Sequence, residues 1–256
     1  MPAHTPPKDL LSERIILITG AGDGIGRAAA LACAAHGATV VLLGRTIRKL
    51  EETYDQIEQA GHPQAAIYPM NLEGATPKDY GDLAATLETE FGRLDGLLHN
   101  AALLGTLAPI AHQDVELWFK VMQVNLHAPF LLTRACLGLL MKSPDASLLF
   151  TSDSVGRRGR AYWGAYGVAK FGLEGLSQIL AQELETNTTV RVNSIDPGPT
   201  GTRLRTQAYP GENALALPTP ESIMPAYLYL LGPDSRGVTG QQFDAQNFDW
   251  PATTPS

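Results

Sequence analysis

Short apolar runs alternate along the chain with amphipathic stretches of helical length. The apolar runs lie at 14–19, 39–43, 65–70, 95–99, 147–152 and 190–195, with a weaker run at 241–245. The stretches of helical length lie at 24–36, 46–60, 77–91, 114–141, 163–186 and 220–231. Continuous apolar strands that alternate with helices are typical of a parallel sheet covered on both faces. The pattern therefore predicts an α/β fold with one doubly wound domain.

The limits of this domain follow from where the alternation begins and stops. No linker interrupts it, so we predict a single domain at 14–246. The Pro-rich start at 1–13 predicts a flexible lead, and 247–256 predicts a similar tail. Proline and glycine punctuate 199–222, which predicts a mobile lid over the substrate.

Composition excludes several classes of protein. A chain of 256 residues that is 44% hydrophobic can bury a sizeable core, and its net charge of −7 argues against nucleic-acid binding. The longest apolar run contains Arg134, so we predict no membrane span. Cys33 and Cys136 lie in apolar surroundings without a CxxC pair, which indicates reduced thiols in a cytoplasmic protein. The histidines show no metal-ligand spacing, and no metal site is predicted.

Polar and glycine residues follow the predicted strands at the same end. A glycine cluster follows the first strand, Arg45 the second, Asn71 the third and Asn100 the fourth. A Thr-Ser-Asp-Ser cluster follows the fifth strand, and a Pro-Gly pair follows the sixth. In open parallel sheets, ligands bind at the carboxyl ends of the strands. We therefore expect one binding site along this edge.

The glycine cluster predicts a phosphate site. TGAGDGIG begins at Thr19 and places Gly20, Gly24 and Gly26 in the pattern G-x-x-x-G-x-G. Glycines permit a tight turn and a close backbone approach, and the following helix points free N–H groups at a phosphate.

The end of the second strand predicts which dinucleotide binds. Many dinucleotide sites have an acid there that holds the ribose 2′-hydroxyl, whereas this chain has Gly44-Arg45. A charge-assisted contact from a guanidinium to a 2′-phosphate gives about 1.5–3 kcal/mol. We therefore predict NADP(H) as the preferred cofactor, with NAD(H) as a possible one, and Arg48 as a further contact.

These residues and a helical Tyr-x-x-x-Lys pair carry a family resemblance. Gly20-x-x-x-Gly24-x-Gly26, Asn100-Ala101-Ala102, Asn125, Tyr166-x-x-x-Lys170 and Pro197-Gly198 occur in this order. Over about residues 12–246 the chain resembles the short-chain dehydrogenases/reductases (SDRs). It is most similar to the YciK-like bacterial oxidoreductases. The resemblance implies a seven-stranded sheet in a Rossmann fold, hydride transfer between NAD(P) and a carbonyl or secondary alcohol, and a homodimer or homotetramer.

The resemblance also implies the roles of individual residues. Tyr166 is the expected general acid in reduction, and the Lys170 ammonium is expected to lower the tyrosine pKa and to hold the nicotinamide ribose. The residues expected to hold the cofactor are Gly20, Asp23, Gly24, Ile25, Gly26, Arg45, Asn71, Leu72, Asn100, Ala101, Ala102, Tyr166, Lys170, Pro197, Gly198, Thr200 and Thr202. In the family, the motif that reads Asn100-Ala101-Ala102 here usually has a glycine where this chain has alanine, and an aspartate often stands at the position of Asn71.

Asn125 carries a signal of its own. Pro129 follows it by four residues within an apolar helical run, and proline has no N–H. The carbonyl of Asn125 therefore loses its helical donor and can hold a water, which suits the proton relay that the resemblance implies. A kinked core helix with a satisfied asparagine explains the same residues.

The main departure from the family lies thirteen residues before Tyr166, where the family usually has serine and this chain has Asp153. An ionised aspartate accepts hydrogen bonds but cannot donate one to a carbonyl. It also opposes Lys170 by raising the pKa of Tyr166. Ser154 or Ser152 could supply the hydroxyl, Asp153 could face a cationic substrate group or stay protonated, or catalysis could be impaired.

Three functions remain open at this point. The first is an NADP(H)-dependent reductase of a carbonyl compound, with Asn125, Asp153, Ser154, Tyr166 and Lys170 as its catalytic residues. The second is an NAD-linked alcohol dehydrogenase. The third is a sensor or scaffold that binds the cofactor without turnover. Five arginines near the substrate mouth predict either a solvated surface or subunit contact, or an anionic substrate tail: Arg157, Arg158, Arg160, Arg203 and Arg205.

Overall fold

The computed structural model describes residues 6–251 and contains a seven-stranded parallel sheet. The strands are β1 Ile15–Thr19, β2 Thr39–Gly44, β3 Ala66–Pro69, β4 Gly96–His99, β5 Ser147–Thr151, β6 Arg191–Asp196 and β7 Gln242–Asp244. Their order in the sheet is β3-β2-β1-β4-β5-β6-β7. The order reverses between β1 and β4, so a crevice for ligands opens at their carboxyl ends. The predicted fold class is therefore confirmed.

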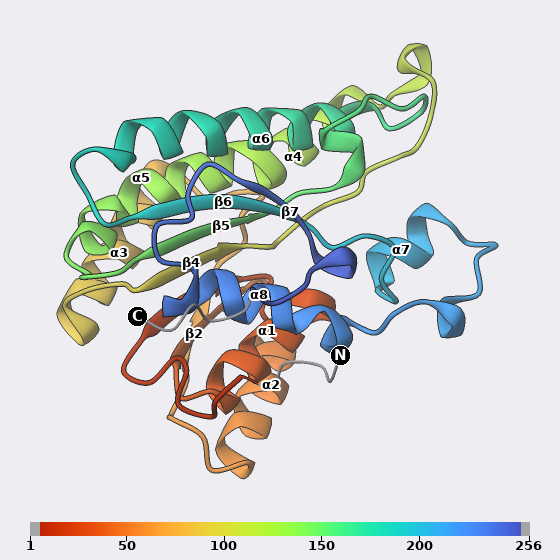
Figure 1. Ribbon diagram of the computed structural model, residues 1–256. Coiled ribbons are helices and arrows are strands. Elements are labelled where there is room, and N and C mark those ends of the chain that lie inside the picture. Colours follow the sequence, from red (N-terminus) through yellow and green to blue (C-terminus); the bar gives the residue numbers. More distant parts are fainter. Residues whose placement is uncertain (1–5, 252–256) are drawn as a thin grey trace.

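Helices cover both faces of the sheet (Figure 1). On one face lie α1 Gly24–Ala35, α2 Ile47–Gln59 and α8 Met224–Leu231. On the other lie α3 Pro77–Phe91, α4 Val115–Met122, α5 Ala128–Met141 and α6 Gly164–Glu185. A further short helix, α7 Arg203–Ala208, projects beyond the carboxyl ends of the strands.

The central strand β1 is covered by helices on both faces, which explains why apolar and polar residues do not alternate in its sequence. Ile16 and Ile18 pack into the core under α1 and α8, whereas Leu17 packs into the core under α3 and α5. All three side chains are fully buried. A strand covered on both faces needs apolar residues at every position, which is the pattern that the sequence showed.

Both ends of the domain extend beyond the predicted limits. Leu10 and Leu11 are buried in the core, and the Leu11 N–H donates to the carbonyl of His36 at 2.8 Å. Phe248 and Trp250 pack against Tyr229 of α8. The prediction of a flexible lead at 1–13 and a tail at 247–256 was therefore wrong for residues 10–13 and 247–250, because apolar side chains anchor these segments. Residues 1–5 and 252–256 lie outside the described residues.

A π-helical turn, Gln123–His127, joins α4 to α5. Pro129 cannot donate a hydrogen bond, and the Ala128 N–H donates to the carbonyl of Gln123, five residues back. The continuous helix Val115–Met141 is long and apolar enough to cross a membrane by length and composition. It packs against α3 and α6 in the domain, as a core helix does.

Candidate active site

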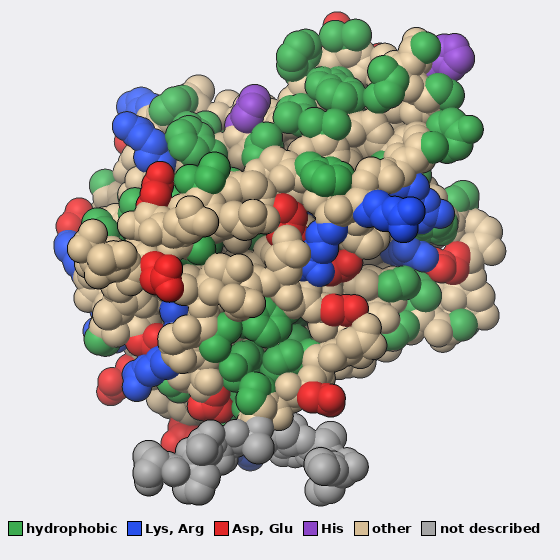
Figure 2. All heavy atoms as spheres, turned by 45° about the horizontal axis from the view of Figure 1, so that its top comes forward, with side chains coloured by type: hydrophobic (Ala, Val, Ile, Leu, Met, Phe, Trp, Pro, Cys, Tyr) green, Lys and Arg blue, Asp and Glu red, His purple; other side chains and the backbone are tan. Residues whose placement is uncertain are grey.

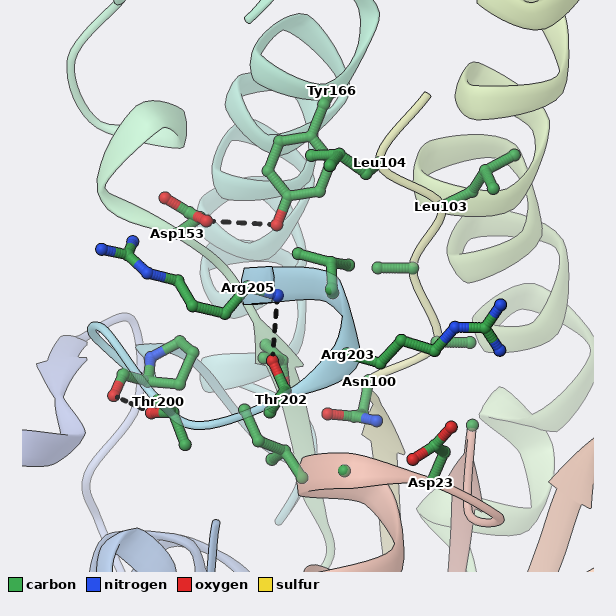
Figure 3. A pocket seen from close by; sticks show the side chains of 18 of the residues that line it. Asp23, Asn100, Leu103, Leu104, Asp153, Tyr166, Thr200, Thr202, Arg203 and Arg205 are labelled. Atoms are coloured by element: carbon green, nitrogen blue, oxygen red, sulfur yellow. Dashed lines mark hydrogen bonds between the residues drawn. The ribbon is translucent and has the colours of Figure 1, made fainter. Parts of the chain in front are cut away.

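A cavity of about 870 Å³ opens at the carboxyl edge of the sheet. It runs from the glycine loop, past the end of β4, to Tyr166 (Figure 3). Every residue that we predicted for the cofactor or for catalysis lines it, except Gly26, Arg48 and Asn125. The site is thus one continuous groove.

The glycine loop forms a cradle at the start of α1. Gly20 and Gly24 have positive φ angles of 71° and 51°, which disfavour other residues. Gly26 lies behind the loop, where an added Cβ would come within 2.3 Å of the Gly20 carbonyl oxygen. Gly26 therefore permits close packing of helix on strand and does not line the cavity. Asp23 makes no side-chain capping bond, so the first N–H groups of α1 are free for a phosphate.

Thr19 fixes the end of β1 to the end of β4. Its hydroxyl oxygen accepts hydrogen bonds from the N–H groups of Asn100 and Ala101, at 2.9 and 3.0 Å. Within residues 6–251, only Glu13 and Tyr162 among non-glycine residues have positive φ. Ala101 and Ala102 therefore occupy their positions without backbone strain, although the family usually has a glycine in this motif.

The adenosine end of the groove contains both basic and acidic groups. Arg45 is exposed and lines the cavity at the end of β2. Lys49 also lines it and forms an ion pair with Asp23. Arg48 does not line the cavity and pairs with Glu52 at 3.0 Å, which argues against the contact that we predicted from it. Because these cations and the free N–H groups of α1 share one groove, the site fits a dinucleotide with an extra phosphate.

At the other end of the groove, Asp153 contacts the hydroxyl of Tyr166. Tyr166 donates to Oδ2 of Asp153 at 3.1 Å (Figure 3). Oδ1 of Asp153 accepts from the N–H of Val155 at 3.0 Å and from the Ser154 hydroxyl at 3.2 Å. Ser154 is exposed and turned toward Asp153, and Ser152 is buried. Of the three candidates, the structure places Asp153 beside the tyrosine hydroxyl.

The ammonium group of Lys170 faces the ring of Tyr166. It donates to the carbonyl of Thr151 at 2.6 Å and sits 5.5 Å from the ring centroid. Burial lowers the pKa of Lys170 to about 8, although the nearby carboxylates of Asp153, Asp196 and Glu174 raise it.

The pKa of Tyr166 differs from our expectation. Burial raises it well above its usual value, and the charges of Asp153 and Asp196 raise it further. We expected the Lys170 ammonium to lower this pKa, whereas the net shift in this structure is upward. The physical reason is that the tyrosine hydroxyl donates to a carboxylate while the ammonium is bound to a backbone carbonyl.

Asn125 is buried outside the cavity, and its side chain binds the backbone of a residue in the cavity wall. Its side-chain amide donates to the carbonyl of Leu103 at 2.9 Å, and its Oδ1 accepts from the N–H of the same residue at 2.8 Å. Leu103 and Leu104 line the groove. The side chain of Asn125 is therefore satisfied within the fold.

A buried carboxylate fixes the elements that surround the catalytic pair. Glu174 lies on α6, one turn beyond Lys170, and accepts from Arg157 at 3.1 Å and from Ser194 of β6 at 2.7 Å. Arg157 also donates to the carbonyl of Phe243 in β7 at 3.0 Å. These contacts hold the turn that follows Asp153 against α6, so they set the distance between Asp153 and Tyr166.

The predicted lid contains α7 and crosses the mouth of the groove. The Thr200 hydroxyl donates to the carbonyls of Pro197 and Gly198, and the Thr202 hydroxyl accepts from the N–H of Arg205 at the start of α7. Thr202 also lies near Gly24 of the glycine loop.

The arginines near the mouth have different surroundings. Arg205 binds Glu212 through two hydrogen bonds of 2.6 and 2.7 Å and lies 3.8 Å from the Tyr209 ring centroid. Arg157 is bound to Glu174, and Arg158 does not line the cavity. Arg160 and Arg203 remain at the cavity wall. This distribution weakens the case for a cluster that binds an anionic substrate tail.

Sequence reasoning missed several residues of the groove. Lys49 stands four positions after Arg45, in the first turn of α2, and this closeness in sequence to Arg45 could have identified it. Asp196 and Tyr209 also line the cavity, but they gave no local signal.

Comparison with known proteins agrees with this geometry. Residues 14–213 match the family model of the short chain dehydrogenases. The chain is 49% identical over 243 residues to the uncharacterized oxidoreductase YciK of Escherichia coli K12, which covers 95% of this chain and 96% of the relative.

Two solved structures are similar over nearly the whole chain. A short chain dehydrogenase from Pseudomonas syringae is 58% identical with a TM-score of 0.94, covering 96% of this chain and 100% of that one. A short chain dehydrogenase from Escherichia coli, solved in complex with NADPH, is 50% identical with a TM-score of 0.91, covering 94% and 100%. The chain therefore belongs to the short-chain dehydrogenase/reductase family and is an oxidoreductase.

Proposed function

We propose that this enzyme is an NADP(H)-dependent reductase in which Tyr166 delivers the proton. The observation that carries the proposal is the buried Tyr166 hydroxyl, which faces the cavity beside Asp153, with Lys170 one helical turn away. The same cavity continues to the glycine cradle and to Arg45. NADPH bound in the solved Escherichia coli relative supports this cofactor.

The groove residues would bind and orient the cofactor. The free N–H groups of α1 would donate hydrogen bonds to the pyrophosphate, and Arg45 with Lys49 would face the 2′-phosphate. Lys170 and Asn100 line the middle of the groove, where the nicotinamide ribose would lie. When bound, the cofactor supplies a hydride, and the protein supplies the proton and excludes water.

Tyr166 is suited to the role of acid. Because burial and the two aspartates raise its pKa, the hydroxyl keeps its proton through the neutral range. A group bound within hydrogen-bond distance of this hydroxyl can receive that proton as reduction proceeds. The Lys170 ammonium then stabilises the phenolate that remains.

The pH dependence of reduction should report the charge of Lys170. Its pKa is lowered to about 8, so the ammonium is present below that pH and is lost as the pH rises through it. We expect kcat/KM for NADPH-dependent reduction to fall above pH 8. A pH–rate profile of the purified enzyme measures this. Reduction that stays constant to pH 10 or above, near the ordinary lysine pKa, would contradict a role for the ammonium.

The proposal is tested by following NADPH oxidation with a panel of ketones, aldehydes, quinones and imines. Titrations with NADPH and NADH should be run beside it. Turnover that depends on Tyr166 supports the reductase. Tighter binding and faster turnover with NADH would support the NAD-linked alcohol dehydrogenase instead. NADPH binding without turnover on the whole panel would support a sensor or scaffold.

The outer surface of α4, α5 and α6 supports self-association. Phe119, Phe130, Val168, Phe171 and Ile179 are each at least 44% exposed on these helices. In Figure 2 hydrophobic side chains gather on the upper part of the molecule, which α4 and α6 occupy in Figure 1. Such a patch favours contact with a second apolar surface. We infer a homodimer or homotetramer in the cytoplasm.

A charge in this patch should weaken the assembly. Phe171→Glu would place a carboxylate in an apolar interface and should lower the mass measured by light scattering at micromolar concentration. Glu183→Gln on the same helix provides a control that removes a charge. An unchanged mass for Phe171→Glu would locate the interface elsewhere.

A further inference from the structure

The reacting atom of the substrate must lie close to Asp153. Tyr166 donates its hydroxyl hydrogen to Oδ2 of Asp153 at 3.1 Å. A substrate atom that receives this hydrogen must replace Oδ2 as the acceptor, at about 2.6–3.2 Å from the hydroxyl. That atom is then a direct neighbour of the Asp153 carboxylate. The chemistry of Asp153 therefore selects the kind of atom that binds there.

Asp153 offers only acceptors to its neighbours. Its Oδ1 accepts hydrogen bonds from Val155 and Ser154, and its Oδ2 accepts from Tyr166. No lysine or arginine nitrogen in the part of the chain that the structure describes lies within 4.0 Å of this carboxylate. The negative charge on Oδ2 thus faces the cavity without a direct ion-pair partner.

The two cations that could neutralise Asp153 are bound to other groups. Lys170 donates to the carbonyl of Thr151 at 2.6 Å. Arg205, which lies on the Asp153 side of the cavity in Figure 3, is held by both oxygens of Glu212. Asp196 lines the same end of the cavity and adds a second negative charge. This end of the cavity therefore favours a substrate group with an N–H or a positive charge.

A carbonyl substrate fits this environment poorly. Its oxygen would place a second acceptor beside Oδ2, and negative charge would develop on it during reduction, next to a carboxylate. A C=N nitrogen behaves in the opposite way. Once Tyr166 has protonated it, the nitrogen carries an N–H and a positive charge, both of which the carboxylate stabilises.

The remaining walls of the cavity suit a flat apolar ring. Trp163 and Tyr209 line it with their ring centroids 6.0 Å apart, and Trp163 lies 5.6 Å from the ring of Tyr166. Leu104 and Val155 complete this apolar wall. Asp153 therefore lies beside an apolar wall, where it can make an orienting contact with a ring bound against that wall.

From this geometry we propose that the enzyme reduces the C=N bond of an apolar cyclic imine, and that Asp153 binds the protonated nitrogen. This inference rests on the reductase function proposed above. The nitrogen lone pair takes the proton of Tyr166, forming N–H as O–H breaks. Hydride supplied by NADPH forms C–H, and the C=N π pair becomes the nitrogen lone pair. The products are a secondary amine, NADP⁺ and a phenolate that regains its proton from water.

The test compares two substrates that share the same pair of fused six-membered rings, dihydroisoquinoline and the ketone α-tetralone, with NADPH. We expect kcat/KM for the imine to exceed that for the ketone by about 10-fold or more. Reduction of the imine develops no negative charge beside the Asp153 carboxylate, whereas reduction of the ketone does. Asp153→Ser should reverse this preference by lowering imine turnover and raising ketone turnover. Asp55→Asn, which removes an exposed carboxylate outside the cavity, should leave the ratio unchanged.

A binding measurement separates recognition from turnover. Tetrahydroisoquinoline should bind the enzyme–NADP⁺ complex about 10-fold more tightly than α-tetralol, and Asp153→Asn should remove that difference. Ketone turnover that needs Tyr166 and exceeds imine turnover in the wild type would overturn the inference and leave the reductase intact. Turnover of another carbonyl compound of the panel but of neither bicyclic compound would also overturn the inference alone, whereas NADPH binding without turnover on the whole panel would overturn both proposals.

Discussion

Replacing Tyr166 with phenylalanine should lower kcat for NADPH-dependent reduction by about 10²- to 10⁴-fold, the usual contribution of a positioned acid. The substitution removes one oxygen from a side chain that is only 4% exposed and is packed against Trp163. The ring therefore stays in place while the proton donor is lost. Steady-state kinetics with the best compound of the panel gives the change in kcat.

NADPH affinity should change little in the same variant, since the phosphate cradle lies at the far end of the groove. A fluorescence titration checks this. Tyr162→Phe is the matched control, because Tyr162 is 60% exposed and does not line the cavity. If Tyr166→Phe kept kcat within a few-fold of the wild type, Tyr166 would not be the proton donor, and a bound water or Asp153 would have to supply the proton.

The arrangement of the sheet and its binding edge could be read from the sequence. The apolar runs predicted every strand, because a strand buried on both faces has no polar positions to obscure it. The residues that follow those strands were predicted to share one edge, and most of them line one cavity. Local pattern was sufficient here because topology places all the carboxyl ends together.

Long-range packing could not be read in the same way. Leu10 and Leu11 appear as part of a Pro-rich lead, yet they are buried in the core that α1 and α8 share, and α8 lies near the other end of the chain. The role of Gly26 also depends on a contact that is distant in sequence, since the side chain of Asn100, together with the carbonyl of Gly20, leaves no room for a Cβ. Such constraints exist only after the elements have packed.

The electrostatic interactions of Tyr166 and Lys170 were the other feature that could not be predicted from the sequence. Tyr166 and Lys170 are one turn apart on α6, so the sequence suggested a direct effect of the ammonium on the phenol. The turn that begins at Asp153 instead brings a carboxylate to the hydroxyl, while the carbonyl of Thr151 takes the ammonium. A one-residue difference in that turn decides whether a serine or an aspartate faces the tyrosine, and spacing alone could not resolve it.

Exchanging Arg45 for aspartate should reverse the choice of cofactor. Arg45 is exposed at the end of β2 and lines the groove where an extra phosphate would lie. The variant loses a charge-assisted contact and places a carboxylate opposite the phosphate, so kcat/KM for NADPH should fall by about 100-fold. An acid at this position can also accept hydrogen bonds from a ribose hydroxyl, so kcat/KM for NADH should rise. Kinetics with both cofactors at a fixed substrate concentration measures the exchange.

Arg48→Asp separates this contact from a general effect of charge. Arg48 lies three residues further on, is bound to Glu52 and does not line the groove. Arg48→Asp changes the net charge of the protein by the same amount as Arg45→Asp. A long-range attraction for the more highly charged NADPH would therefore weaken equally in both variants, and this attraction would diminish with salt. A loss confined to Arg45→Asp, and retained at high salt, would show that the guanidinium contacts the phosphate. Equal losses in the two variants would instead leave Lys49 as the residue that selects the cofactor.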